Sequence, residues 1–225
     1  MNRPVINTYY DLHLDQADID AGRHRDAVGG LWEQIGLLQY HFLLERGLRR
    51  DHHLVDIGCG ALRGGIHFVR YLDAGRYHGI DLSAAMIEAA RHELRLARLL
   101  PKEPRLIEDD AFAMTRFGER FDYALAMSLF THLPLNHIIR CLVETRKVLA
   151  EGGRLYATFF EAPAPAHLEP IRHEPGGIVT HYDSDPYHLS FDECAWAGRQ
   201  AGLNAELIGE WQHPRDQRML CFTPA

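Results

Sequence analysis

The chain has 225 residues, a length typical of one domain, or of one domain with an appended segment. Its 24 basic and 31 acidic side chains give a formal net charge of −7, which argues against a general attraction to nucleic acid or to an anionic membrane. Hydrophobic residues make up 46% and charged residues 24%, which is typical of a globular protein with its own core and excludes a largely disordered chain.

The sequence shows no sign of a leader, a membrane helix or a metal site. The first residues contain no apolar h-region, and no apolar run approaches the roughly 18 residues of a membrane helix. The four cysteines are scattered without a C-x-x-C pair, and the 15 histidines lack zinc-binding helical spacing. We therefore expect a cytoplasmic protein with reduced thiols, no bound metal and no membrane partner.

The elements before residue 50 differ in character. Residues 1–29 are polar and show little periodicity, whereas residues 30–48 repeat apolar side chains at helical spacing. Gly47 is a stop signal for this expected helix. The first 49 residues thus read as a segment and one helix that precede the main domain.

From residue 50 onward, short apolar runs alternate with helical patterns. This alternation predicts an α/β fold with a parallel sheet covered by helices on both faces. A final pair of strands, joined by a turn-like link, predicts an antiparallel hairpin at the sheet edge. The expected strands are 53–60, 77–83, 104–110, 121–128, 153–161, 205–211 and 217–223, and the expected helices are 64–72, 84–100, 135–149 and 191–202.

Residues 162–190 interrupt this rhythm. They hold five prolines and a Gly-Gly pair, and a long segment without periodicity is usually functional or disordered. The segment also carries several His and Tyr side chains, which combine an apolar body with a polar tip and suit a pocket wall. We expect a lid here; the alternative is a surface loop stabilised by its own aromatic side chains.

A glycine-rich turn carries the chemistry. In LVDIGCGALRGG, residues 54–65, Gly58 and Gly60 follow an expected strand and precede an expected helix. Glycines there let the backbone turn sharply and approach a ligand, while the helix start offers free N–H groups. Arg63 occupies the place of the third glycine of a dinucleotide fingerprint, which argues against a nicotinamide enzyme.

The turn resembles motif I of the class I S-adenosylmethionine-dependent methyltransferases. Asp56 matches the motif acid, Gly58 and Gly60 match the first two glycines, and Leu62 stands where a third glycine is often found. The later strands match the family in order and spacing, over about residues 50–160 and 190–225. The resemblance implies a doubly wound, mostly parallel seven-stranded sheet with an antiparallel C-terminal hairpin.

The resemblance also implies how the cofactor, S-adenosylmethionine, would be held. Asp81, at the end of the second strand, would accept hydrogen bonds from both ribose hydroxyls; alternatively it caps the following helix. An acid after the third strand would meet the adenine, with Asp110 preferred over Asp109. The expected cofactor-binding residues are Asp56, Gly58, Cys59, Gly60, Asp81, Leu82, Asp109, Asp110, Ala111 and Ser128.

The acceptor should lie beyond the carboxyl ends of the fourth and fifth strands. His132 is the candidate base, and Glu161 is a second candidate for catalysis or acceptor binding. The competing interpretations are that His132 caps or packs against the next helix and that Glu161 is an exposed loop acid. The expected acceptor-binding residues are Phe130, Tyr182, Tyr187 and His188.

These features predict a methyltransferase that acts on a small molecule, such as a sugar or secondary metabolite, by O- or N-methylation. Residues 1–49 would cover the cofactor pocket, 50–225 would form the catalytic domain, and 162–190 would be the acceptor lid. The enzyme alternative is a nucleic-acid or protein methyltransferase, although residues 128–131 lack the N/D-P-P-Y/F tetrapeptide. The alternative of another class is a non-catalytic cofactor- or partner-binding protein with this fold.

Overall fold

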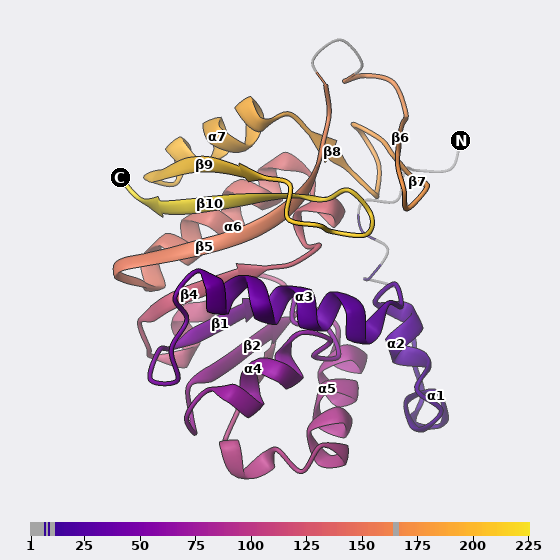
Figure 1. The fold of residues 1–225 in the computed structure, drawn as a ribbon, viewed down its shortest axis with the longest axis vertical. Coiled ribbons are helices and arrows are strands. Elements are labelled where there is room, and N and C mark those ends of the chain that lie inside the picture. Colours follow the sequence, from indigo (N-terminus) through magenta and orange to yellow (C-terminus); the bar gives the residue numbers. More distant parts are fainter. Residues whose placement is uncertain (1–6, 8, 10–11, 164–166) are drawn as a thin grey trace.

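A mixed sheet forms the centre of the molecule (Figure 1). The computed structural model describes residues 7, 9, 12–163 and 167–225. The strand order is β3-β2-β1-β4-β5-β10-β9; β1 to β5 are parallel, and β10 runs antiparallel to both neighbours. This confirms the expected doubly wound fold. The strands are β1 (Leu54–Ile57), β2 (Tyr77–Asp81), β3 (Arg105–Glu108), β4 (Phe121–Ala126), β5 (Leu149–Glu161), β9 (Leu203–Gly209) and β10 (Arg218–Pro224).

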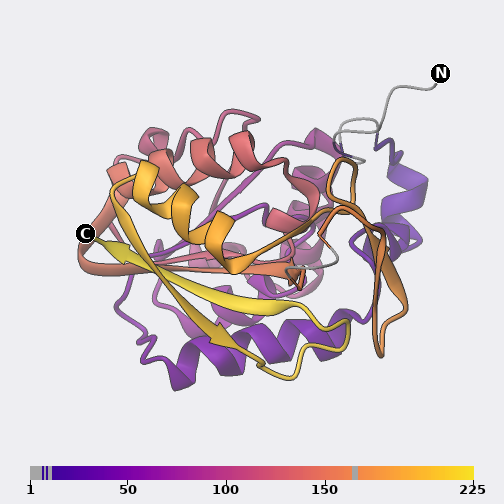
Figure 2. The same cartoon turned by 90° about the horizontal axis from the view of Figure 1, so that it is seen from above.

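Helices cover both faces of the sheet, as Figure 2 shows from above. On β1, Val55 and Ile57 pack into the core beneath α6 and α7, whereas Leu54 packs into the core beneath α3, α4 and α5. All four residues of β1 are buried, as expected of a parallel strand covered on both faces. The helices are α3 (Trp32–Glu45), α4 (Gly65–Tyr71), α5 (Ala84–Leu96), α6 (Leu135–Val148) and α7 (Phe191–Gln200).

The N-terminal segment contains two short helices that the sequence pattern did not predict. They are α1 (Gln16–Asp20) and α2 (Arg23–Ala27). A reciprocal capping box between Asp15 and Asp18 starts α1. Because helices of five residues are marginal in isolation, tertiary contacts must hold this segment in place.

An ion-pair cluster attaches the segment to α5. His24 Nε2 lies 2.7 Å from Glu93 Oε1, and Arg25 donates to both carboxylate oxygens of Glu93 at 2.7 and 2.9 Å. The His24 and Glu93 side chains are 1% and 6% exposed. Burial alone would raise the pKa of Glu93, but the Arg25 and His24 hydrogen bonds lower it below its usual value. We call residues 12–30, held in this way, the N-terminal strap.

Glu93→Gln should therefore destabilise the protein. The amide keeps the shape but weakens the bonds to His24 and Arg25, so we expect a loss of about 1–3 kcal/mol, or several degrees in Tm. Glu88→Gln, on the exposed part of the same helix, is the matched control and should change the Tm little. Equal melting temperatures for the two variants would contradict a structural role for the cluster.

The segment 162–190 is folded where the structure describes it. Strands β6 (Ile171–His173) and β7 (Ile178–Thr180) form an antiparallel hairpin, and strand β8 (His188–Leu189) pairs in parallel with the end of β5. The hairpin lies at the same end of the sheet as α1 and α2 (Figure 1). No helix in the described part of the chain is long and apolar enough to cross a membrane.

Candidate active site

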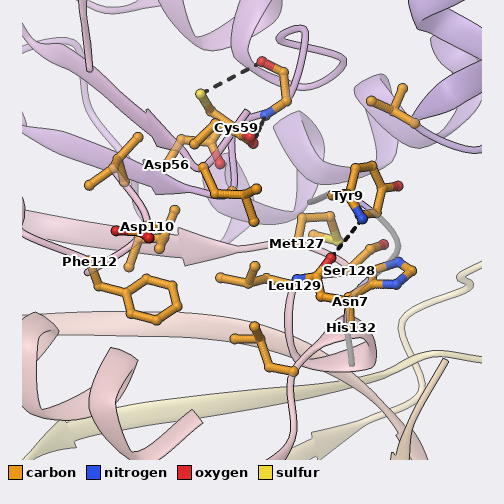
Figure 3. A pocket seen from close by; sticks show the side chains of 18 of the residues that line it. Asn7, Tyr9, Asp56, Cys59, Asp110, Phe112, Met127, Ser128, Leu129 and His132 are labelled. Carbon is orange, nitrogen blue, oxygen red and sulfur yellow. Dashed lines mark hydrogen bonds between the residues drawn. The ribbon is translucent and has the colours of Figure 1, made fainter. Parts of the chain in front are cut away.

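A cavity lies at the carboxyl ends of β1, β2, β3 and β4, beneath the N-terminal strap. It contains about 1250 Å³ of empty space, part of it open to solvent. Figure 3 shows Asp110 and Phe112 at one end and Asn7, Tyr9 and His132 at the other. The expected residues that line it are Asp56, Gly58, Cys59, Gly60, Asp81, Leu82, Asp109, Asp110, Ser128 and His132.

The glycine turn forms the floor of the cavity. Gly58 and Gly60 have φ angles of +71° and +51°, which glycine adopts without the penalty of a Cβ atom. A Cβ on Gly58 would lie only 3.0 Å from the Leu129 side chain. Leu62, in place of the family's third glycine, also adopts a left-handed φ of +70° and is fully buried. Leu62 therefore keeps the backbone conformation of a glycine. The burial of its side chain offsets the strain of this left-handed backbone.

Asp56 is a buried acid at the end of β1. Tyr77 donates a hydrogen bond of 2.7 Å to its Oδ2. Burial raises the pKa of Asp56 to about 7, although the Tyr77 bond acts in the opposite direction. The carboxyl group therefore changes charge near neutral pH, and a cation in the cavity would favour its ionised form.

Asp81 has two structural partners and still faces the cavity. Its Oδ2 accepts from Gly60 N–H at 2.8 Å and its Oδ1 accepts from Ser83 N–H at 2.9 Å. Ser83 itself caps α5, so Asp81 ties the glycine turn to the start of that helix. A carboxylate has about four acceptor sites, so these bonds leave room for ligand hydroxyls. The two interpretations of Asp81, helix cap and ligand contact, are thus compatible.

The two acids after β3 differ in their surroundings. Asp109 accepts from Ala111 and Ala113 N–H and from Arg116. Burial would raise the pKa of Asp109, but these hydrogen bonds lower it. Asp109 therefore shapes the turn, whereas the exposed Asp110 carboxylate lines the cavity without a hydrogen bond or ion pair to any described residue. Ala111 does not line the cavity, and its N–H donates to Asp109 Oδ1 instead of pointing to a ligand.

Arg63 brings a buried positive charge to the cavity wall. One terminal nitrogen donates to the carbonyls of Val28 and Gly30, at 2.8 and 3.1 Å, and so fastens the strap. Burial lowers the pKa of Arg63 to about 10, still well above neutral. Its side chain forms hydrogen bonds to backbone carbonyls and no ion pair with a carboxylate of the described residues, so an anionic ligand group is a suitable partner.

Ser128 is fixed by side chains from other elements. It has a φ of +54° and follows β4. Its N–H donates to Thr158 Oγ1, its carbonyl accepts from Thr131, and its hydroxyl donates to Gln217 Oε1, at 2.7, 2.7 and 3.0 Å. A strained residue held at three atoms is typical of a functional position.

His132 lies at the other end of the cavity, between two segments that are distant in sequence. Its Nδ1 is 2.6 Å from Asp185 Oδ1, which belongs to the segment 162–190. The Tyr9 ring meets the His132 ring edge-on, with centroids 5.0 Å apart. Neither contact was predicted from the sequence, because both depend on the tertiary arrangement.

Two expected acceptor-end residues lie outside the cavity. Phe130 is fully buried in the core and packs against Phe222, with ring centroids 6.2 Å apart. Glu161, at the end of β5, lies 3.7 Å from Arg218 and does not line the cavity. The preference of an apolar ring for the core accounts for the position of Phe130. Glu161 is held outside the cavity by its strand pairing with Leu189 of β8 and by its ion pair with Arg218.

The aromatic residues expected to form the lid also lie outside the lining. Tyr182 is 49% exposed. Tyr187 is buried and donates its N–H to Thr131, and the buried His188 bonds to Thr180 and His167. The His188 side chain thus stabilises the segment itself, and Asp185 links the segment to His132 in the cavity. Further lining residues, which the sequence analysis did not single out, are Asn7, Tyr9, Val28, Gln39, Phe112, Met127, Leu129, Leu133, His137 and Arg140.

Comparisons with known proteins agree with this geometry. Residues 55–155 match the family model described as a methyltransferase domain. A probable methyltransferase, ltbC, from Aspergillus luteorubrus is 27% identical over 117 residues, which are 48% of this chain and 40% of that protein. The match thus spans about two fifths of the relative's length.

Solved structures share the fold. A methyltransferase from Clostridium acetobutylicum that depends on S-adenosylmethionine aligns with a TM-score of 0.68, at 11% identity, over 94% of this chain and 100% of that one. The magnesium protoporphyrin IX methyltransferase of Synechocystis PCC 6803, with S-adenosylhomocysteine bound, gives 0.60 at 15% identity over 96% and 90%.

Residues 55–155 thus match a methyltransferase domain, and the chain as a whole shares its fold with methyltransferases of known structure. The fold is that of the class I S-adenosylmethionine-dependent methyltransferases.

Proposed function

We propose that the protein transfers the methyl group of S-adenosylmethionine to a small molecule bound beside His132. The observation that carries this proposal is the cavity itself, which has acids and glycines at the tips of β1 to β3 and a histidine beyond β4. In doubly wound sheets, ligands bind at this edge.

Each end of the cofactor has a complementary group in the cavity. The Asp81 carboxylate would accept from the ribose hydroxyls, and Asp110, beside Phe112, would accept from the adenine amino group. The Arg63 guanidinium would bind the carboxylate of the amino-acid end, above the glycine turn. Asp56 would face the α-ammonium group of the same end, which S-adenosylhomocysteine also carries. These roles use the residues that have free acceptor or donor capacity in the cavity.

The bound donor supplies a methyl carbon attached to a positively charged sulfur, which makes it electrophilic without further activation. The protein's main task is then to hold the acceptor atom in line behind that carbon. Tyr9, which precedes the strap, and Asp185 of the segment 162–190 both reach the cavity end where His132 lies, and they would exclude water there. We propose His132, and not Glu161, as the group that receives the acceptor's proton.

A small acceptor is favoured by the enclosure of this end. Tyr9, from the N-terminal region, and Asp185, from the inserted segment, both contact His132. These contacts would limit the access of a large partner, such as a protein or nucleic acid, to this end of the cavity. The net charge of −7 also disfavours nucleic acid. The protein from Synechocystis is named for a porphyrin, a small molecule, which supports the same class of acceptor.

Incubation with cofactor labelled in the methyl group tests this proposal. A cell extract is separated by size into small molecules, proteins and nucleic acids, and each fraction is offered to the enzyme. We expect label only in the small-molecule fraction, together with S-adenosylhomocysteine. Label in protein or nucleic acid would contradict the proposed acceptor class. Binding of S-adenosylhomocysteine without turnover on any fraction would favour the non-catalytic alternative.

Cofactor binding should weaken as the pH falls below about 7. In the free protein Asp56 has a pKa raised to about 7, and a cationic ligand favours its ionised form. Binding at lower pH must therefore displace a proton, which costs affinity. Calorimetry of S-adenosylhomocysteine near pH 6.5, in buffers of different ionisation enthalpy, should detect proton release, and Asp56→Asn should reduce it. Equal heats in all buffers would show that Asp56 does not face the cation.

A further inference from the structure

The pair of His132 and Asp185 has the arrangement of a base and its orienting acid. Asp185 Oδ1 lies 2.6 Å from His132 Nδ1, and the Asp185 side chain is only 1% exposed. His132 is 26% exposed and lines the cavity. The acid therefore lies behind the ring, away from solvent, and the imidazole faces the space that a ligand would fill.

This contact determines which imidazole nitrogen is free. An ionised carboxylate only accepts hydrogen bonds, so Nδ1 must carry the proton that it donates to Asp185. In the neutral ring, Nε2 then bears the lone pair, and no described residue hydrogen-bonds to it. The edge-on contact with Tyr9 limits rotation of the ring. His132 is thus oriented to accept a proton at Nε2.

The distribution of charge around the cavity indicates what the acceptor presents. The cavity-lining carboxylates are at the tips of β1, β2 and β3, in the half assigned to the cofactor. Near His132, no carboxylate of the described residues lines the cavity, since Glu161 lies outside and Asp185 lies behind the ring. Among the residues that the structure describes, this end offers a proton acceptor but no carboxylate counter-ion for an ammonium group. A hydroxyl group needs such a base, because it is a weak nucleophile until its proton leaves.

We propose that Asp185 is a positioning residue that fixes the His132 tautomer, and that the acceptor is a hydroxyl compound methylated on oxygen. This inference rests on the proposed function. The acceptor oxygen forms its bond to the donor methyl carbon as the carbon–sulfur bond breaks, with that electron pair left on sulfur. The hydroxyl proton moves to His132 Nε2, and Asp185 stabilises the resulting imidazolium.

The tautomer can be measured without knowing the acceptor. Long-range proton–nitrogen NMR of the full chain, with His132 assigned by comparison with His132→Gln, should show the Nδ1–H tautomer in the wild-type protein. Asp185→Asn should shift the ring toward the Nε2–H tautomer. The matched control is Asp183→Asn, which changes an exposed acid two residues away and should leave the tautomer unchanged. A wild-type Nε2–H tautomer would overturn the proposed role of Asp185.

Kinetics and product analysis test the effect of Asp185 on catalysis and the proposed methylation on oxygen. With an acceptor isolated from the labelled small-molecule fraction, Asp185→Asn should lower kcat at least about tenfold, while the Kd for S-adenosylhomocysteine stays within about threefold. Asp183→Asn should retain full kcat, and the labelled product should carry its methyl group on oxygen. An N-methylated product, or an unchanged kcat in Asp185→Asn, would overturn the inference. Failure of the wild-type protein to bind S-adenosylhomocysteine would instead contradict the proposed function.

Discussion

Asp81→Ala is expected to weaken the binding of S-adenosylhomocysteine by at least about a hundredfold. The carboxylate would lose two charge-assisted bonds to the ribose hydroxyls, each worth roughly 1.5–3 kcal/mol. It would also release Gly60 and Ser83, whose N–H groups it now holds at 2.8 and 2.9 Å. Isothermal calorimetry measures the change, and a melting curve shows whether the variant is folded.

A smaller ligand separates the ribose contact from the rest of the site. 5′-Methylthioadenosine keeps the ribose and adenine but lacks the amino-acid end, so Asp81→Ala should weaken its binding by a similar factor. Asp73→Ala removes a surface carboxylate that pairs with Arg50 and serves as the control. If folded Asp81→Ala bound both ligands as tightly as the wild type, Asp81 would be a helix cap only.

Arg63→Met is expected to weaken the binding of S-adenosylhomocysteine by about a hundredfold, because the ligand carboxylate loses its charge-assisted bonds to the guanidinium. Methionine preserves much of the volume of the side chain. The variant also loses the bonds from Arg63 to Val28 and Gly30, so part of the loss would come from a looser strap.

Methylthioadenosine again separates the two contributions. It has no carboxylate, so its affinity should report only the looser strap and should fall much less than that of S-adenosylhomocysteine. The control is Arg70→Met, on the exposed side of α4, where no described residue forms an ion pair with the guanidinium. Equal losses for both ligands in Arg63→Met would show that Arg63 acts on the strap and not on the carboxylate.

The succession of strands along the chain, and the acids and glycines at their tips, could be predicted from the sequence. Both depend on local patterns, namely apolar runs that end in glycine or an acid at the tip of a strand. The structure places Asp56, Gly58, Gly60 and Asp81 together because adjacent parallel strands end at one edge. The exact edge of each helix was less predictable; the helix expected at 84–100, for example, ends at Leu96.

The acceptor end could not be predicted in the same way. Asp185 meets His132 across 53 positions of the sequence, and Glu93 meets His24 across 69. Such contacts follow from how separate segments pack, and no local spacing encodes them. Composition identified residues 162–190 as unusual, but it favoured Tyr182, Tyr187 and His188 as acceptor-binding residues. None of the three lines the cavity.

The position of β10 affects how the site forms during protein synthesis. This strand follows β9 in the sequence, yet it lies between β5 and β9, so β9 has no partner in the sheet until β10 has been made. Ser128 likewise depends on Gln217, which is 89 residues further along. A ribosome-bound chain that stops before residue 217 therefore lacks one support of Ser128 at the cavity wall. Donor binding and methyl transfer should mature only after these late residues have been translated and docked.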